Sequence, residues 1–203
     1  MTIRKLIQLS AFALILLLGV GGVIAVVLAT VWGLSRLWQR TVELPEAQRK
    51  LVRDGLALIC AARESLPLRV VEELLEWKED QAGDEFLPLA REMLLEESWD
   101  EVPAYRPFHE SLRELVERKL AGRRGGSIGA YHRVLGQYAA WPVEGDEFRR
   151  SYALRHRVEH RVESGDLDDA AKACMDLGFL TAKACAEGVV AVERDVQLAR
   201  EAR

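Results

Sequence analysis

Residues 6–35 read LIQLSAFALILLLGVGGVIAVVLATVWGLS and contain no charged side chain. About twenty apolar residues cross the hydrocarbon of a bilayer as a helix, so this run is long enough even if it tilts. Arg4 and Lys5 precede the run, and Arg36 and Arg40 follow it. We therefore expect residues 1–40 to be a single-pass transmembrane anchor with basic flanks, in contact with membrane lipid.

The C-terminal end of this run has the residues of a membrane interface. Trp32 and Trp38 alternate there with Arg36 and Arg40, and indole and guanidinium groups are enriched at the level of the lipid headgroups. A cleaved signal peptide is the alternative, with residues 27–29 as the cleavage site. Its apolar region would usually be only about 7–15 residues long, so we favour the anchor.

Small side chains recur at every fourth position of the same run, at Gly21, Ala25, Ala29 and Gly33. On a helix these positions form one face, and small residues let two backbones approach closely in lipid. We expect this face to pack against another integral membrane protein or a second copy of the chain. Chance is the alternative, because glycine and alanine are common in membrane helices.

The orientation of the anchor stays open. Basic residues are more numerous after the run than before it, which by the positive-inside rule favours a cytoplasmic location for the rest of the chain. A short basic start followed by an apolar run is also typical of a signal anchor, which would place the domain outside. We lean toward the cytoplasmic side.

Charge divides the 203-residue chain into two parts. Residues 1–40 carry +4 and the whole chain carries −4, so residues 41–203 carry −8. A nucleic-acid-binding protein needs a basic surface for phosphates, so no nucleic-acid partner is expected. The three cysteines have irregular spacing and are expected to be buried free thiols, which favours a reducing compartment.

Helix signals dominate the rest of the chain. After a connector at 41–46, residues 47–203 show apolar positions at steps of three and four, interrupted by proline and glycine. We expect an all-α fold: one N-terminal transmembrane helix plus an antiparallel soluble domain of about six or seven helices. No segment shows sustained alternation of apolar and polar residues, so no sheet is expected. The helices are predicted at 46–65, 68–80, 84–102, 108–121, 128–140, 146–164 and 167–199.

The last predicted helix has an unusual face of small residues. Its members include Cys174, Gly178, Ala182, Cys185 and Val189, at steps of three and four. A helix with such a face packs closely against a neighbour. It is either the terminal core helix of its own domain or a helix that docks on another subunit.

Residues 156–160 read HRVEH, which matches the HxxEH pattern of inverted zinc peptidases. His156 and His160 would lie one turn apart, and Glu159 would act as base toward a metal-bound water. No third ligand pattern accompanies them in this highly charged stretch. We interpret the three residues instead as part of a solvent-exposed helix face, and we expect no metal site.

No other motif indicates catalysis. The glycine-rich run at 122–129 lacks the Gly-Lys-Ser/Thr of a phosphate-binding loop and follows a helix, so no cofactor is expected. The sequence therefore favours a non-enzymatic scaffold or accessory subunit of a membrane protein complex. A tethered adaptor resembling tetratricopeptide repeats, which would bind peptide segments, and a zinc hydrolase are the alternatives.

Overall fold

The computed structural model describes Gly33, Arg36, residues 38–120 and residues 127–203. The chain divides into two compact units, 1–43 and 44–203, which are considered separately. In the first unit, residues 38–43 are helical, although the connector was expected to begin at 41. Among the described residues, no helix has both the length and the apolar character needed to cross a membrane.

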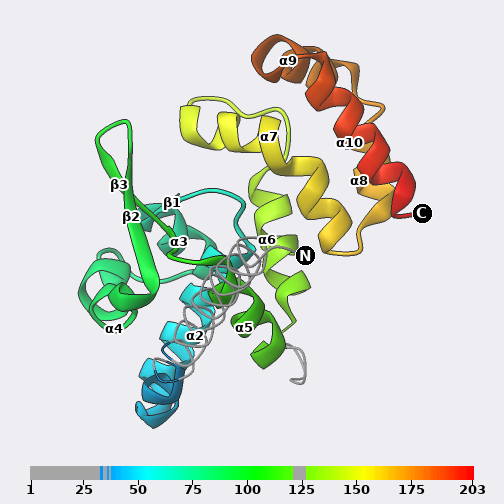
Figure 1. The fold of residues 1–203 in the computed structure, drawn as a ribbon. Coiled ribbons are helices and arrows are strands. Elements are labelled where there is room, and N and C mark those ends of the chain that lie inside the picture. The colour runs from blue at the N-terminus through cyan, green and yellow to red at the C-terminus, as the bar shows by residue number, and fades with distance from the viewer. Residues whose placement is uncertain (1–32, 34–35, 37, 121–126) are drawn as a thin grey trace, which may run out of the picture. The chain divides into compact units, whose positions relative to one another are not determined.

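Helices make up most of the second unit, which confirms the prediction of a mainly helical domain (Figure 1). Short elements, including a π-helical turn (η1) and a 3₁₀ turn (η2), replace the predicted helix at 84–102. The elements are α2 (Glu46–Ala61), β1 (Leu66–Pro67), α3 (Leu68–Leu75), η1 (Ala82–Phe86), α4 (Leu87–Ala90), η2 (Arg91–Met93), β2 (Leu94–Trp99), β3 (Val102–Pro107), α5 (Glu110–Leu120), α6 (Ile128–Tyr138), α7 (Glu147–Glu163), α8 (Leu167–Ala173), α9 (Leu177–Glu187) and α10 (Val189–Glu201).

The C-terminal half of α2 is the centre of the core. Residues 55–61 are all buried, because α5, α6, η1 and β3 surround this part of the helix. Gly55 allows the closest of these contacts. A Cβ at Gly55 would lie 2.5 Å from the Cε2 atom of the buried Phe86 ring, so only glycine fits beside that ring.

A three-stranded antiparallel sheet is present, so the expectation of no sheet is wrong. Strands β2 and β3 form a hairpin in which Trp99 pairs with Val102, and β1 pairs with β3 at only two positions. The two loop residues, Asp100 and Glu101, both have positive φ, as a tight hairpin turn requires. The glycine that usually marks such a turn is missing, and β2 is exposed along most of its length, so it shows no alternation.

Helix α7 joins the two halves of this unit. It packs against α6 on one side and against α8, α9 and α10 on the other (Figure 1). Asp146 caps it by accepting a hydrogen bond from the backbone N–H of Arg149 at 2.9 Å. A second apolar cluster lies between α7 and the last three helices, and Phe179 is its largest buried residue.

Candidate functional site

The polar residues of α7 are packed against two neighbouring elements rather than against solvent. His160 is fully buried and His156 is mostly buried, so the expectation of a solvent-exposed helix face is wrong for both. The sequence could not reveal this burial, because the covering residues come from α6 and from the loop after α2. His132 on α6 is 28 residues from His160, and Arg63 is nearly a hundred residues from Glu159.

His160 lies at the centre of a short chain of hydrogen bonds. Its Nδ1 atom is 2.9 Å from Nδ1 of His132 on α6, and its Nε2 atom is 2.7 Å from the hydroxyl of Tyr152, two turns earlier on α7. The Tyr152 and His160 rings also stack, with centroids 5.6 Å apart. Both nitrogens of His160 are therefore engaged by side chains of the protein.

This geometry limits the protonation of the histidine pair. In an Nδ1···Nδ1 contact one ring donates and the other accepts, so the two imidazoles cannot both be protonated. Burial lowers the pKa of His132 from 6.5 to about 4 and lowers the pKa of His160 further. Burial also raises the pKa of the Tyr152 hydroxyl well above its usual value. All three groups are neutral near pH 7.

A set of ion pairs lies beside the histidines, between α7 and residues 63–64 at the end of α2. Arg155 contacts Glu64 at 2.6 Å, and Arg63 contacts Glu159 at 3.0 Å. His156 lies between the two carboxylates, 3.8 Å from Glu64 and 3.6 Å from Glu159. Burial alone would lower the pKa of His156, but these two carboxylates outweigh burial and raise it.

The HxxEH residues are therefore held by neighbouring side chains of the protein. His160 uses both ring nitrogens in hydrogen bonds, and Glu159 is paired with Arg63. Within the described residues, no group of three potential ligands is close enough together to hold a metal ion. The arrangement can fix α7 against α6 and the end of α2, because the hydrogen bonds and ion pairs join all three elements.

A second buried polar pair joins the last two helices. Lys183 on α9 and Asp195 on α10 contact each other at 2.5 Å, and both side chains are almost fully buried. The ammonium group of Lys183 also donates to the backbone carbonyl of Arg155 at 3.3 Å, which links both helices to α7. Burial raises the pKa of Asp195, although the charge of Lys183 opposes that shift.

The segment expected as one helix over 167–199 is three helices, so that prediction is wrong. Asp176 caps α9, and Gly188 separates α9 from α10 with a φ of 87° that favours glycine. The predicted partner-binding residues are consequently distributed over three elements. They are Cys174 at the end of α8, Gly178, Ala182 and Cys185 on α9, and Val189 at the start of α10.

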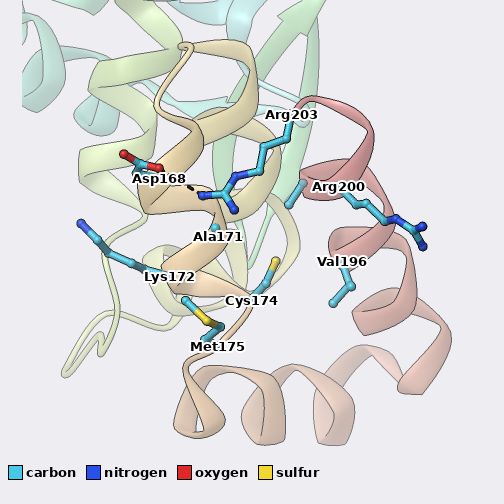
Figure 2. A pocket seen from close by; sticks show the side chains of 9 residues that line it. Asp168, Ala171, Lys172, Cys174, Met175, Val196, Arg200 and Arg203 are labelled. Atoms are coloured by element: carbon cyan, nitrogen blue, oxygen red, sulfur yellow. Dashed lines mark hydrogen bonds and ion pairs between the residues drawn. The ribbon is translucent and has the colours of Figure 1, made fainter.

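An open groove lies between α8 and α10, with a volume of about 530 Å³ (Figure 2). We call it the α8–α10 groove. Its apolar lining comes from both helices, and its charged residues lie around the edge. The lining residues are Asp168, Ala171, Lys172, Cys174, Met175, Val196, Ala199, Arg200 and Arg203. Sequence reasoning missed this groove because α10 was expected to continue α8 rather than to lie beside it.

The cysteines differ from one another in exposure. Cys60 is buried, Cys174 is half-buried and Cys185 is exposed, and all three are free thiols. The expectation of buried free thiols is therefore correct for Cys60 and wrong for Cys185. Burial raises the pKa of the Cys60 thiol to about 12, so it is unreactive at neutral pH.

Most of the predicted membrane residues lie outside the described part of the chain, namely Gly21, Ala25, Ala29 and Trp32. Of the others, Gly33 is helical and a Cβ placed on it would meet no atom within 4 Å. Arg36 and Arg40 are exposed, and Trp38 is half-buried.

Comparison of the chain with protein families, with curated protein sequences and with solved structures finds no match.

Proposed function

We propose that the protein is a membrane-anchored helical scaffold or accessory subunit that acts by holding another protein. The observation that carries this proposal is an exposed, uncharged surface formed by α9 and the first two residues of α10. We call it the α9 face. It consists of Leu177, Gly178, Thr181, Cys185, Val189 and Val190, all of which are exposed.

The α9 face is unusual for a chain in which 30% of the residues are charged. Leu177 and Val190 are each 77% exposed, at opposite ends of the face. Charged side chains of α9 do not interrupt this surface, because Lys183 points into the core and only Glu187 is exposed. An apolar surface of this kind, framed by charged residues, is typical of a protein–protein contact.

The N-terminal run supplies the second part of the proposal. Thirty uncharged residues at 6–35 are more stable in lipid than in water, and the four-residue spacing of small side chains suits close packing with another membrane helix. With the basic residues that follow the run, we propose that the helical domain is on the cytoplasmic side. The protein would then hold its partner at the membrane through two faces.

We further propose that the protein is not an enzyme. Three buried side chains with strongly perturbed pKa values, His132, His160 and Tyr152, are engaged with one another. A catalytic acid or base needs a pKa near the working pH and access to a substrate. These three groups are neutral and enclosed, so packing of α7 is the role that they suit.

Cys185 allows a direct test, because its exposed thiol lies within the α9 face. We expect maleimide to label Cys185 more slowly in native membranes than in the purified full-length chain, because the partner covers the face. A cysteine introduced at the hairpin tip, Glu101→Cys, is the matched control and should react equally fast in both. The double variant Leu177→Asp/Val190→Asp should restore fast labelling of Cys185 in membranes.

The anchor has its own test. Gly21→Leu with Ala25→Leu should reduce assembly with a partner or second copy, measured by native mass spectrometry from mild detergent, while leaving the chain in the membrane fraction. Recovery of the native chain in the aqueous fraction would disprove the anchor. Equal rates of Cys185 labelling in native membranes and in the purified chain would remove the α9 face from the proposal.

A further inference from the structure

We infer that the α8–α10 groove binds an amphipathic helix of a protein partner that presents acidic residues beside its apolar ones. This inference rests on the proposed scaffold function and names the chemistry of the partner. It depends on the shape and the charge of the groove.

The floor of the groove is apolar and partly open. Ala171 and Cys174 from α8 lie opposite Val196 from α10, which is 44% exposed (Figure 2). Ala199 of α10 also lines the groove. Burial raises the pKa of the Cys174 thiol, so it adds a neutral surface to the floor. A volume of about 530 Å³ is sufficient for apolar side chains projecting from one face of a helix.

Each end of the groove is defined by a different kind of residue. At one end, Arg203, which follows α10, reaches Asp168 on α8, with Nη2 and Oδ1 3.1 Å apart (Figure 2). At the other end Met175 follows α8 and is 71% exposed. Methionine is flexible and polarisable, so it can adjust to the side chains of a partner.

Cations dominate the rim. The groove is lined by three basic residues, Lys172, Arg200 and Arg203, and by one acidic residue, Asp168. Lys172 extends on the α8 side, where it is paired with Asp169 at 2.8 Å, and Arg200 extends on the α10 side (Figure 2). Arg200 forms no ion pair with the residues that the structure describes, which leaves its guanidinium available to a carboxylate.

This distribution of charge distinguishes the partner from other apolar ligands. A helix with Leu at every third or fourth position fills the floor, and its flanking Glu side chains meet Lys172 and Arg200. Surface ion pairs contribute about 0.2–1 kcal/mol each, so two such pairs favour an acidic over a basic helix by about tenfold.

The test uses the full-length chain in phosphatidylcholine nanodiscs and two synthetic peptides. Both peptides carry the same amphipathic Leu pattern, one with Glu and the other with Lys on its flanks, and binding is measured by fluorescence anisotropy. We expect the Glu peptide to bind about tenfold more tightly. Val196→Asp should abolish binding of both, because it places a charge on the floor.

Charge reversal makes the test specific. Lys172→Glu/Arg200→Glu should invert the preference between the two peptides. The matched control Arg118→Glu/Lys119→Glu makes the same charge change on α5, where both side chains are exposed, and should not alter binding. Circular dichroism confirms that each variant is folded. Arg200→Glu alone, which breaks no ion pair among the described residues, gives the same comparison should the double variant unfold.

Three outcomes would overturn the inference. They are equal binding of the two peptides, an unchanged preference after charge reversal, and charge-dependent binding to phosphatidylglycerol vesicles without peptide binding. The last would indicate a lipid surface as the ligand. Continued protection of Cys185 in native membranes alongside any of these would leave the scaffold function intact and remove only the groove. Charge-dependent peptide binding without protection of Cys185 would support the groove and count against the α9 face.

Discussion

Replacing His132 by asparagine should reduce the loss of folding stability at acidic pH. The buried imidazole of His132 has its pKa lowered from 6.5 to about 4, whereas in the unfolded chain it takes up a proton below about pH 6.5. The unfolded state therefore binds more protons between these pH values, and the free energy of unfolding falls as the pH drops through this interval. The pKa of His160 is shifted in the same direction.

The magnitude follows from the size of the shift. A difference of one pKa unit corresponds to about 1.4 kcal/mol, so His132 alone accounts for a loss of about 3 kcal/mol by pH 4. His156 has the opposite sign, because its folded pKa is raised. Its stabilisation is complete below the unfolded pKa and is lost as the pH rises above 6.5 through the folded pKa, so it does not protect against acid.

The assay compares urea unfolding of the full-length chain in mild detergent at pH 7.5 and pH 4.5, followed by tryptophan fluorescence. Asparagine keeps a polar group near the position of Nδ1 but does not titrate. His132→Asn should therefore lower stability at pH 7.5 and lose about 2–3 kcal/mol less than wild type on acidification. His109→Asn, at an exposed position outside the network, is the matched control. The same acid dependence in wild type and His132→Asn would refute the reasoning.

Two further substitutions test the packing. Lys183→Met leaves the Asp195 carboxylate buried without its partner and should destabilise the chain by about 3–5 kcal/mol in urea unfolding, and Lys183→Met/Asp195→Leu should recover most of that loss. If the double variant were no better than the single one, the ion pair would not explain the loss. Gly55→Ala should cost about 1–3 kcal/mol, because the new Cβ displaces the buried Phe86 ring; a neutral result in the same assay would show that the ring moves freely.

Local signals in the sequence predicted several helix boundaries, because caps and helix breaks depend on neighbouring residues. Asp146 was expected to open a helix and does so by capping α7, and the break expected at Gly165 separates α7 from α8. The hairpin of β2 and β3 was missed because its turn, Asp100-Glu101, lacks the usual glycine and β2 is exposed. Pro103 and Pro107 mark a break between the helices predicted at 84–102 and 108–121. Both prolines lie in β3 outside the two positions that pair with β1.

The candidate site was only partly predictable because its contacts are long-range. His156, Glu159 and His160 were recognised as a possible constellation, but the partners that determine their chemistry were not. His132 is 28 residues away on α6, and Arg63 and Glu64 are nearly a hundred residues away. The sequence holds one usable signal, since His132 is three residues before the buried Leu135 and shares its helix face.

In the C-terminal segment, the helical spacing was recognised correctly but was assigned to one helix instead of three. The small residues from 167 to 199 recur at helical spacing throughout, yet the backbone reverses after Gly188, so that α10 packs back against α9, α8 and α7. This reversal brings Lys183 and Asp195 together inside the domain. With its lysine turned inward, α9 exposes uncharged residues to the outside. The buried ion pair and the α9 face are thus two consequences of one packing arrangement, and a ligand that covers the face compensates for the apolar surface that this arrangement exposes.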